Sequence, residues 1–195
     1  MRDEKRGQAY TLEAVIAALL IISSLIFALQ VTAVTPLSAS TSNQHIENQQ
    51  RASADGVLAA AQESGALKDA VLYWNDSAGK FHNTTAVDFY TNEYPRNEFG
   101  AILDRAFGGR GLAVNVKLHT QGQSSAQRLI YRGAPSDNAV TASRQVTLYD
   151  DDTLTAPGYE GTNVSAANSY DKAVSERSNS SVYNVVRVEV TVWRM

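Results

Sequence analysis

The sequence predicts an α+β protein, with a long N-terminal apolar helix that crosses a membrane and a second helix packed on an antiparallel β-sheet head. Three observations predict this fold class. Residues 14–34, AVIAALLIISSLIFALQVTAV, form an apolar stretch of 21 residues. Residues 44–65 are rich in glutamine and alanine and favour helix. Residues 182–193 alternate between valine and mostly polar side chains, as a half-buried strand does.

The apolar stretch has the length of a membrane span. As a helix, residues 14–34 would extend roughly 31 Å at about 1.5 Å per residue, close to the hydrocarbon thickness of a bilayer. Arg2, Lys5 and Arg6 precede it, and only Arg51 follows within about 20 residues. The positive-inside rule therefore places the N-terminus in the cytoplasm and the rest of the chain outside.

These features divide the chain into three expected parts of a single-pass protein of the cell membrane. Residues 1–10 form a cytoplasmic leader, residues 11–35 the transmembrane helix, and residues 36–195 an extracellular α+β domain. Two alternatives for the apolar stretch remain open. It could be a buried core helix, or a secretory signal that is cut after Ala33 at a small-x-small site.

An acid stands at the front of this apolar stretch. Glu13 costs free energy there unless it is paired or stays at the membrane interface. The segment RGQAYTLEAVIAALLII resembles the class III signal of type IV pilins and related pilin-like proteins. That pattern has a basic residue and a glycine, an aromatic-Thr-Leu-like stretch, a glutamate and an uninterrupted apolar helix. Through RGQAYTLEAV and TPLSASTSNQHIENQQ, the whole chain is also similar to an uncharacterised haloarchaeal family of pilin-like membrane proteins.

The resemblance implies a processing site, a role for Glu13 and a set of partners. A prepilin peptidase would cut near Arg6, Gly7 and Gln8. Cutting after Gly7 makes Glu13 the sixth mature residue, cutting after Gln8 makes it the fifth, and an uncut chain is a third alternative. Glu13 would pair with the new α-amino group of its own or a neighbouring subunit. The implied function is a structural or accessory subunit of a type IV pilus-like surface assembly, in contact with membrane lipid and other pilin-like subunits.

The region after the apolar stretch predicts a helix and irregular structure. Pro36 predicts the end or a kink of the first helix, and residues 37–42 predict a polar hinge. Residues 44–65 either continue the first helix and pack on a sheet or form a separate surface helix. Residues 68–90 are expected to form short strands or irregular structure with turns.

The rest of the chain supplies the sheet. A short helix is expected over residues 97–107, ended by Gly108 and Gly109. Four strands are predicted, at residues 112–119, 126–132, 140–149 and 182–193. In the last strand the valines at 186, 188, 190 and 192 share one face, which we expect to pack against the helix. Residues 151–181 are a long polar connection, expected as a surface loop or a partly mobile excursion.

Composition and motifs argue against several classes of site. The net charge of -3 offers no basic stripe for nucleic acid, and the absence of cysteine removes disulfides, thiolate metal sites and a catalytic thiol. His45, His82 and His119 are far apart in sequence and are expected at the surface. The acids of residues 150–152 are expected in a solvated turn rather than in a calcium site. We therefore expect no cofactor and no enzymatic activity.

Modification and rival functions complete the expectations. Four Asn-x-Ser/Thr sequons fall after the apolar stretch, at Asn75, Asn83, Asn163 and Asn179, which fits N-glycosylation of an exported domain. Two other functions stay open. The chain could be an anchored or secreted extracytoplasmic binding domain, or an enzyme with an unrecognised site.

Overall fold

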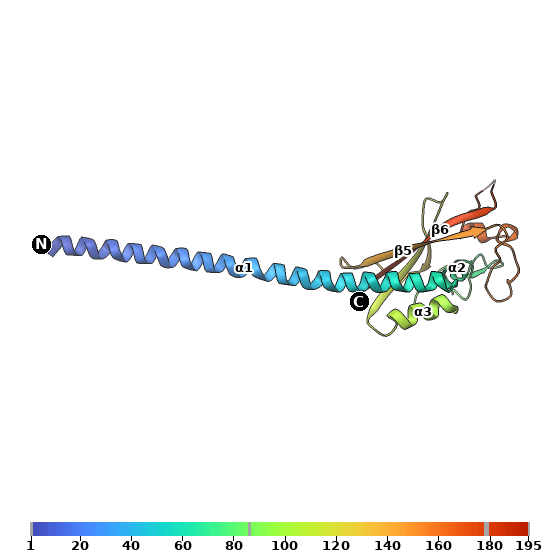
Figure 1. Cartoon of the computed structure of the whole chain (residues 1–195), viewed down its shortest axis with the longest axis horizontal. Helices are drawn as coiled ribbons and strands as arrows, with labels where there is room; N and C mark the ends of the chain where they lie inside the picture. Colours follow the sequence, from blue (N-terminus) through green and yellow to red (C-terminus); the bar gives the residue numbers. More distant parts are fainter. Residues whose placement is uncertain (1, 86, 178–179, 195) are drawn as a thin grey trace. The chain divides into compact units, whose positions relative to one another are not determined.

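The structure is a computed structural model that describes residues 2–85, 87–177 and 180–194, without the side chains of residues 2–9 and 31–43. It divides into two compact units, residues 1–46 and residues 47–195. Both units contain part of helix α1 (Arg2–Glu63), which is coloured blue to green in Figure 1. The second unit, called the head below, combines helices with antiparallel strands. The predicted α+β fold class is therefore confirmed.

Helix α1 is longer than the sequence predicts. It continues through Pro36 and residues 37–42, so the prediction of a hinge at this place is wrong. Proline lacks one backbone donor, which weakens a helix locally, but the flanking residues on both sides are helical. The first of the two alternatives for residues 44–65 is the observed one: they continue the first helix, which ends at Glu63.

The last turns of α1 belong to the core of the head. Ala54, Leu58 and Ala61 are fully buried, and their spacing of four and three residues places them on one helix face. They lie in the same hydrophobic cluster as the buried valines of the sheet. The Gln62 side-chain amide also donates to the backbone carbonyl of Gln145, at 3.1 Å. The predicted packing of a helix on the sheet is confirmed for this part of α1.

The main sheet has four antiparallel strands in the order β4-β3-β6-β5. The strands are β3 (Leu112–Thr120), β4 (Gln127–Ile130), β5 (Val140–Tyr149) and β6 (Val182–Arg194). Each lies at or near its predicted place. The valines at 186, 188, 190 and 192 of β6 are fully buried, as their alternation predicts. Trp193, in the same strand, points to the opposite face from these valines and is also buried. Both faces of β6 are therefore covered at that end.

Two helices and a short hairpin complete the ordered elements before the sheet. The hairpin joins β1 (Trp74–Asn75) to β2 (Lys80–Phe81), and α3 (Glu98–Phe107) begins after the cap residue Asn97. The helix α2 (Ala66–Val71) corrects the sequence prediction, which has strands or irregular structure from residue 68 onward. The reason is tertiary: Leu67 and Val71 are buried four residues apart, and one helical turn places both in the core.

The long polar connection after β5 is also different from the prediction. Residues 151–181 contain two short 3-10 helices, η1 (Val164–Ala166) and η2 (Tyr170–Lys172). Leu154, Val164 and Tyr170 are buried in the hydrophobic cluster. The described part of this connection is therefore packed structure and not an open surface loop.

A buried carboxylate holds this connection to the β1–β2 hairpin. Asp76 is 8% exposed, and its carboxylate accepts backbone N–H groups of Asn168 (2.9 Å) and Ser169 (2.8 Å). The Asn168 side-chain amide donates to the same carboxylate at 3.0 Å. The Ser169 hydroxyl lies 3.0 Å from the carboxylate and accepts from the Trp74 indole N–H at 3.0 Å. The backbone N–H groups of Asn168 and Ser169 have no partner in a helix or strand, and the Asp76 carboxylate accepts them instead.

Candidate functional site

Helix α1 carries a span that is long and apolar enough to cross a membrane. Among the described residues this span is Tyr10–Gln30, 21 residues with a mean hydropathy of 2.6 over its most apolar window. None of that window is buried inside the protein. Leu25 is 60% exposed and Phe27 68% exposed, so the chain itself covers neither. An exposed apolar surface of this kind is typical of a segment that lies in a membrane or in an interface.

Glu13 lies near the start of this span and is exposed. Among the side chains that the structure describes, no cation lies within ion-pair distance of its carboxylate. The predicted processing residues Arg6, Gly7 and Gln8 have helical backbone, and their side chains lie outside the described residues. Within the described residues, the structure therefore shows no ion-pair partner for Glu13.

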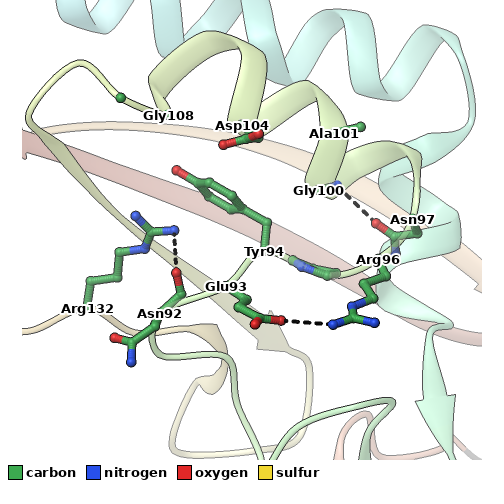
Figure 2. A pocket seen from close by; sticks show the side chains of 12 residues that line it. Asn92, Glu93, Tyr94, Arg96, Asn97, Gly100, Ala101, Asp104, Gly108 and Arg132 are labelled. Atoms are coloured by element: carbon green, nitrogen blue, oxygen red, sulfur yellow. Dashed lines mark hydrogen bonds and ion pairs between the residues drawn. The ribbon is translucent and has the colours of Figure 1, made fainter.

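The head has its own candidate site, a hollow of about 610 Å³ beside helix α3. Its lining consists of residues 92–97, Gly100, Ala101, Asp104, Gly108, Gly109 and Arg132, and we call it the α3 hollow. Figure 2 shows Tyr94 in the middle of this site, between Asp104 of α3 and Arg132 of the segment after β4. Asn97 fixes the start of α3, because its side-chain oxygen accepts the Gly100 N–H at 3.0 Å.

Three side chains set the electrostatics of the α3 hollow. The Arg132 guanidinium lies 4.3 Å from the centre of the Tyr94 ring and donates to the Asn92 carbonyl at 3.4 Å. This stacking on an aromatic face is attractive and holds the cation in place. Burial raises the pKa of Tyr94 above its ordinary value, the Arg132 cation opposes this shift, and the Asp104 carboxylate adds to it. Tyr94 is therefore a neutral hydroxyl at physiological pH.

Several polar atoms of this site lack a hydrogen-bond partner among the described residues. They are the Tyr94 hydroxyl, the side-chain nitrogen Nδ2 of Asn97 and the nitrogen Nε of Arg132. Buried polar groups are normally hydrogen-bonded, so these unpaired groups are expected to bond to water or to a ligand. By contrast, Glu93 and Arg96 form an ion pair at 3.5 Å with both side chains about 70% exposed, which contributes little to stability.

Two glycines shape the walls of the α3 hollow. A Cβ atom at Gly100 would lie 1.8 Å from the Pro95 carbonyl oxygen, so no side chain fits there. A Cβ atom at Gly108 would lie 2.2 Å from the Asp104 carboxylate. The first glycine lets the loop before α3 touch the helix, and the second leaves room for the Asp104 carboxylate. Gly108, predicted to end the helix, therefore also positions a lining residue.

The predicted chemistry-bearing residues outside the hollow have other surroundings. His45 is exposed and His82 is half-buried, while Nε2 of the half-buried His119 lies 3.3 Å from the Glu189 carboxylate. Asp152 forms an ion pair with Lys68 at 2.6 Å and accepts the Tyr149 N–H. Within the described part of the chain, no three histidine or acidic side chains gather as a metal site would require.

The sequons differ in their surroundings. Asn83 and Asn163 are exposed, and Asn83 adopts the left-handed conformation (φ 61°) that asparagine tolerates. Asn75 is half-buried, and its side-chain oxygen accepts the Ala78 N–H at 2.8 Å. Asn179 lies outside the described residues. Glycosylation of these sequons stays a prediction.

Sequence reasoning did not single out Tyr94, Asp104 and Arg132 as a group. They come from a loop, a helix and the end of a hairpin, and no motif joins them. The nearest signal in the sequence is the predicted helix over residues 97–107 with its cap and terminal glycines, which locates one wall of the hollow. The stacking of Arg132 on Tyr94 requires the fold.

Comparison with known proteins gives a family without an assigned activity. Residues 6–192 match DUF7288, described as a family of unknown function. No curated protein and no solved structure matches the chain.

Proposed function

Because this chain belongs to DUF7288, a family of unknown function, we propose its role from its architecture: it is a membrane-anchored, pilin-like structural or accessory subunit of a type IV pilus-like surface assembly. The observation that carries the proposal is the exposed apolar span Tyr10–Gln30 with Glu13 at its start. Such a span needs lipid around it before assembly and apolar helices of other subunits afterwards.

The carboxylate of Glu13 gives the proposed assembly its register. In a low-dielectric helix bundle, an unpaired carboxylate is costly, and attraction to a cation is much stronger than in water. A prepilin peptidase that cuts after Gly7 or Gln8 creates an α-amino group within a few residues of Glu13. Pairing of this amine with Glu13, in the same or a neighbouring subunit, would fix the axial position of one helix against the next.

The N-terminus of the mature protein tests the processing step. The protein is purified from membranes of the native host, and its N-terminal peptide is identified by mass spectrometry. A start at Gln8 or Ala9 supports the proposal. A start at Val34 would show an ordinary secreted domain whose apolar stretch is removed, and the proposal would then be abandoned.

Substitution of Glu13 tests the assembly step. Glu13→Ala should leave the protein in the membrane fraction but reduce its amount in surface assemblies sheared from cells, because the pairing carboxylate is lost. Gln30→Ala is the matched control, since it removes a polar side chain at the other end of the same span. Equal amounts of the two variants in the sheared fraction would refute the pairing role.

A second function is an anchored binding domain. The α3 hollow supports it, because its polar side chains line an open concave surface of the head. The two functions differ in what they need: the first depends on Glu13 and the second on residues of the head. Loss of assembly in Glu13→Ala with intact ligand binding would separate them.

A further inference from the structure

We propose that the α3 hollow and a smaller hollow beside it form one saccharide-binding trough on the head. The smaller hollow has a volume of about 150 Å³, and Asn92 and Glu93 line both. It adds the exposed hydroxyl groups of Thr85 and Thr91 to the same surface. This inference goes beyond the assembly role, because every lining residue belongs to the head and no second subunit is needed.

The charges of the trough favour a neutral ligand. Glu93 and Asp104 carry negative charge, and Arg96 and Arg132 carry positive charge, so the formal charges of the lining cancel. A free anion or cation would therefore find no net attraction. A sugar hydroxyl both donates and accepts, so it can bond to carboxylates, guanidinium groups and amides at once. Hydrogen bonds to such charged partners are also stronger than those between neutral groups.

The geometry of Arg132 favours binding with little ordering cost. Its guanidinium is held on the Tyr94 ring and by the Asn92 carbonyl. A group that is already fixed loses less entropy when a ligand binds.

The shape of the trough agrees with an extended polar chain. Apolar ligands prefer enclosed pockets with mainly hydrophobic walls, whereas this surface is open and most of the side chains that line it carry polar or charged groups. Two adjoining hollows with shared residues suit neighbouring sugar rings. An oligosaccharide is therefore the ligand class that fits the lining groups, their charge balance and the two adjoining hollows.

Direct binding measurements test the proposal. The full chain is placed in phosphatidylcholine nanodiscs, which avoid sugar-headed detergents, and fluorescently labelled maltohexaose, chitohexaose and mannohexaose are titrated by anisotropy. Saturable binding of at least one probe that an excess of the unlabelled sugar displaces is the expected result. Absence of saturable binding for all three probes overturns the proposal.

Matched variants locate the binding. Ala101 is exposed on the wall of the hollow, so Ala101→Trp should fill it and abolish binding, whereas Ala101→Ser should bind as the native chain does. Asp104→Asn should weaken binding on the order of tenfold through loss of a charged acceptor. Glu98→Gln on the same helix, outside the lining, should change nothing.

Other outcomes contradict the proposal. Urea unfolding of each variant confirms that it is folded, and undiminished binding in folded Ala101→Trp would place the sugar elsewhere. Self-association that Ala101→Trp abolishes, without any saccharide binding, would make this surface a contact between copies of the chain and the saccharide proposal wrong.

Discussion

Replacement of Asp76 by alanine should destabilise the head more than any exposed acidic substitution. The variant removes the acceptor of two backbone N–H groups, those of Asn168 and Ser169. An unsatisfied buried donor costs about 1–3 kcal/mol, so the loss of the acceptor for both donors should lower the free energy of unfolding by roughly 2–6 kcal/mol. Asp76→Asn keeps the shape and one acceptor oxygen, and we expect a smaller loss of about 1–3 kcal/mol.

The pH dependence gives this prediction a second readout. Burial raises the pKa of Asp76, but hydrogen bonds from Asn168 and Ser169 outweigh it, so the pKa lies below its ordinary value of 3.8. A carboxyl group with a lowered pKa stabilises the folded state above its unfolded pKa, and this stability is lost as the pH falls through the folded-state pKa. Stability of the native chain should therefore decrease below about pH 4, and Asp76→Asn should show less of this decrease.

The assay is urea unfolding of the full chain in nanodiscs, followed by the fluorescence of the buried Trp74 and Trp193. Asp137→Asn is the control, because it neutralises an exposed carboxylate. If Asp76→Ala unfolds at the same urea concentration as this control, the carboxylate does not hold the connection after β5. An unchanged pH profile in Asp76→Asn would likewise refute the role of its charge.

Four further substitutions, one of them a control, test the packing of α1 in the core, the contact of Gly100 with Pro95 and the burial of Tyr183. Leu58→Ala, at a fully buried site, should lower the free energy of unfolding by about 2–5 kcal/mol in the same assay, and a loss below about 1 kcal/mol would remove this part of α1 from the core. Gly100→Ala should prevent stable folding, because the added Cβ atom would collide with the Pro95 carbonyl oxygen. Gly56→Ala is the control: its added Cβ atom has no atom within 4 Å and should stabilise the chain by about 0.5–1 kcal/mol. Equal urea midpoints of the two variants would contradict the close contact between Gly100 and Pro95. Burial raises the pKa of Tyr183 to about 12. The neutral Tyr183 hydroxyl therefore contributes fully to the stability of the folded state below about pH 10, and this stability is lost as the pH rises through 12. Tyr183→Phe should therefore remove one late step from the tyrosinate absorbance titration, and an unchanged titration would argue against this assignment.

The regular elements of the head could be predicted from local patterns. The valine alternation of β6 and the bounds of β5 (Val140–Tyr149) need only the two-residue period of a strand. Helix α3 could be predicted because Asn97 caps it and glycines follow it. In each of these elements the local preference and the tertiary packing agree.

The remaining elements depend on contacts that the sequence does not display. Helix α2 is too short for a helical period to be recognised in its residues. The connection after β5 looks polar because its anchors, among them Leu154 and Tyr170, are isolated and far apart in the sequence. The hydrogen bonds of Asp76 join residues more than 90 positions away. The α3 hollow was missed for the same reason, since Arg132 meets Tyr94 only after the sheet has formed.

The place of β6 within the sheet sets the order in which the head can form. This strand lies between β3 and β5, yet it comes last of the three in the chain. During synthesis, the apolar span of α1 is available to a membrane long before residues 182–194 exist. Neither neighbour of β6 has its full set of backbone partners until this strand arrives. The proposed anchor can therefore be inserted while the head is still an open chain, and a head that must cross the membrane can do so before its sheet closes.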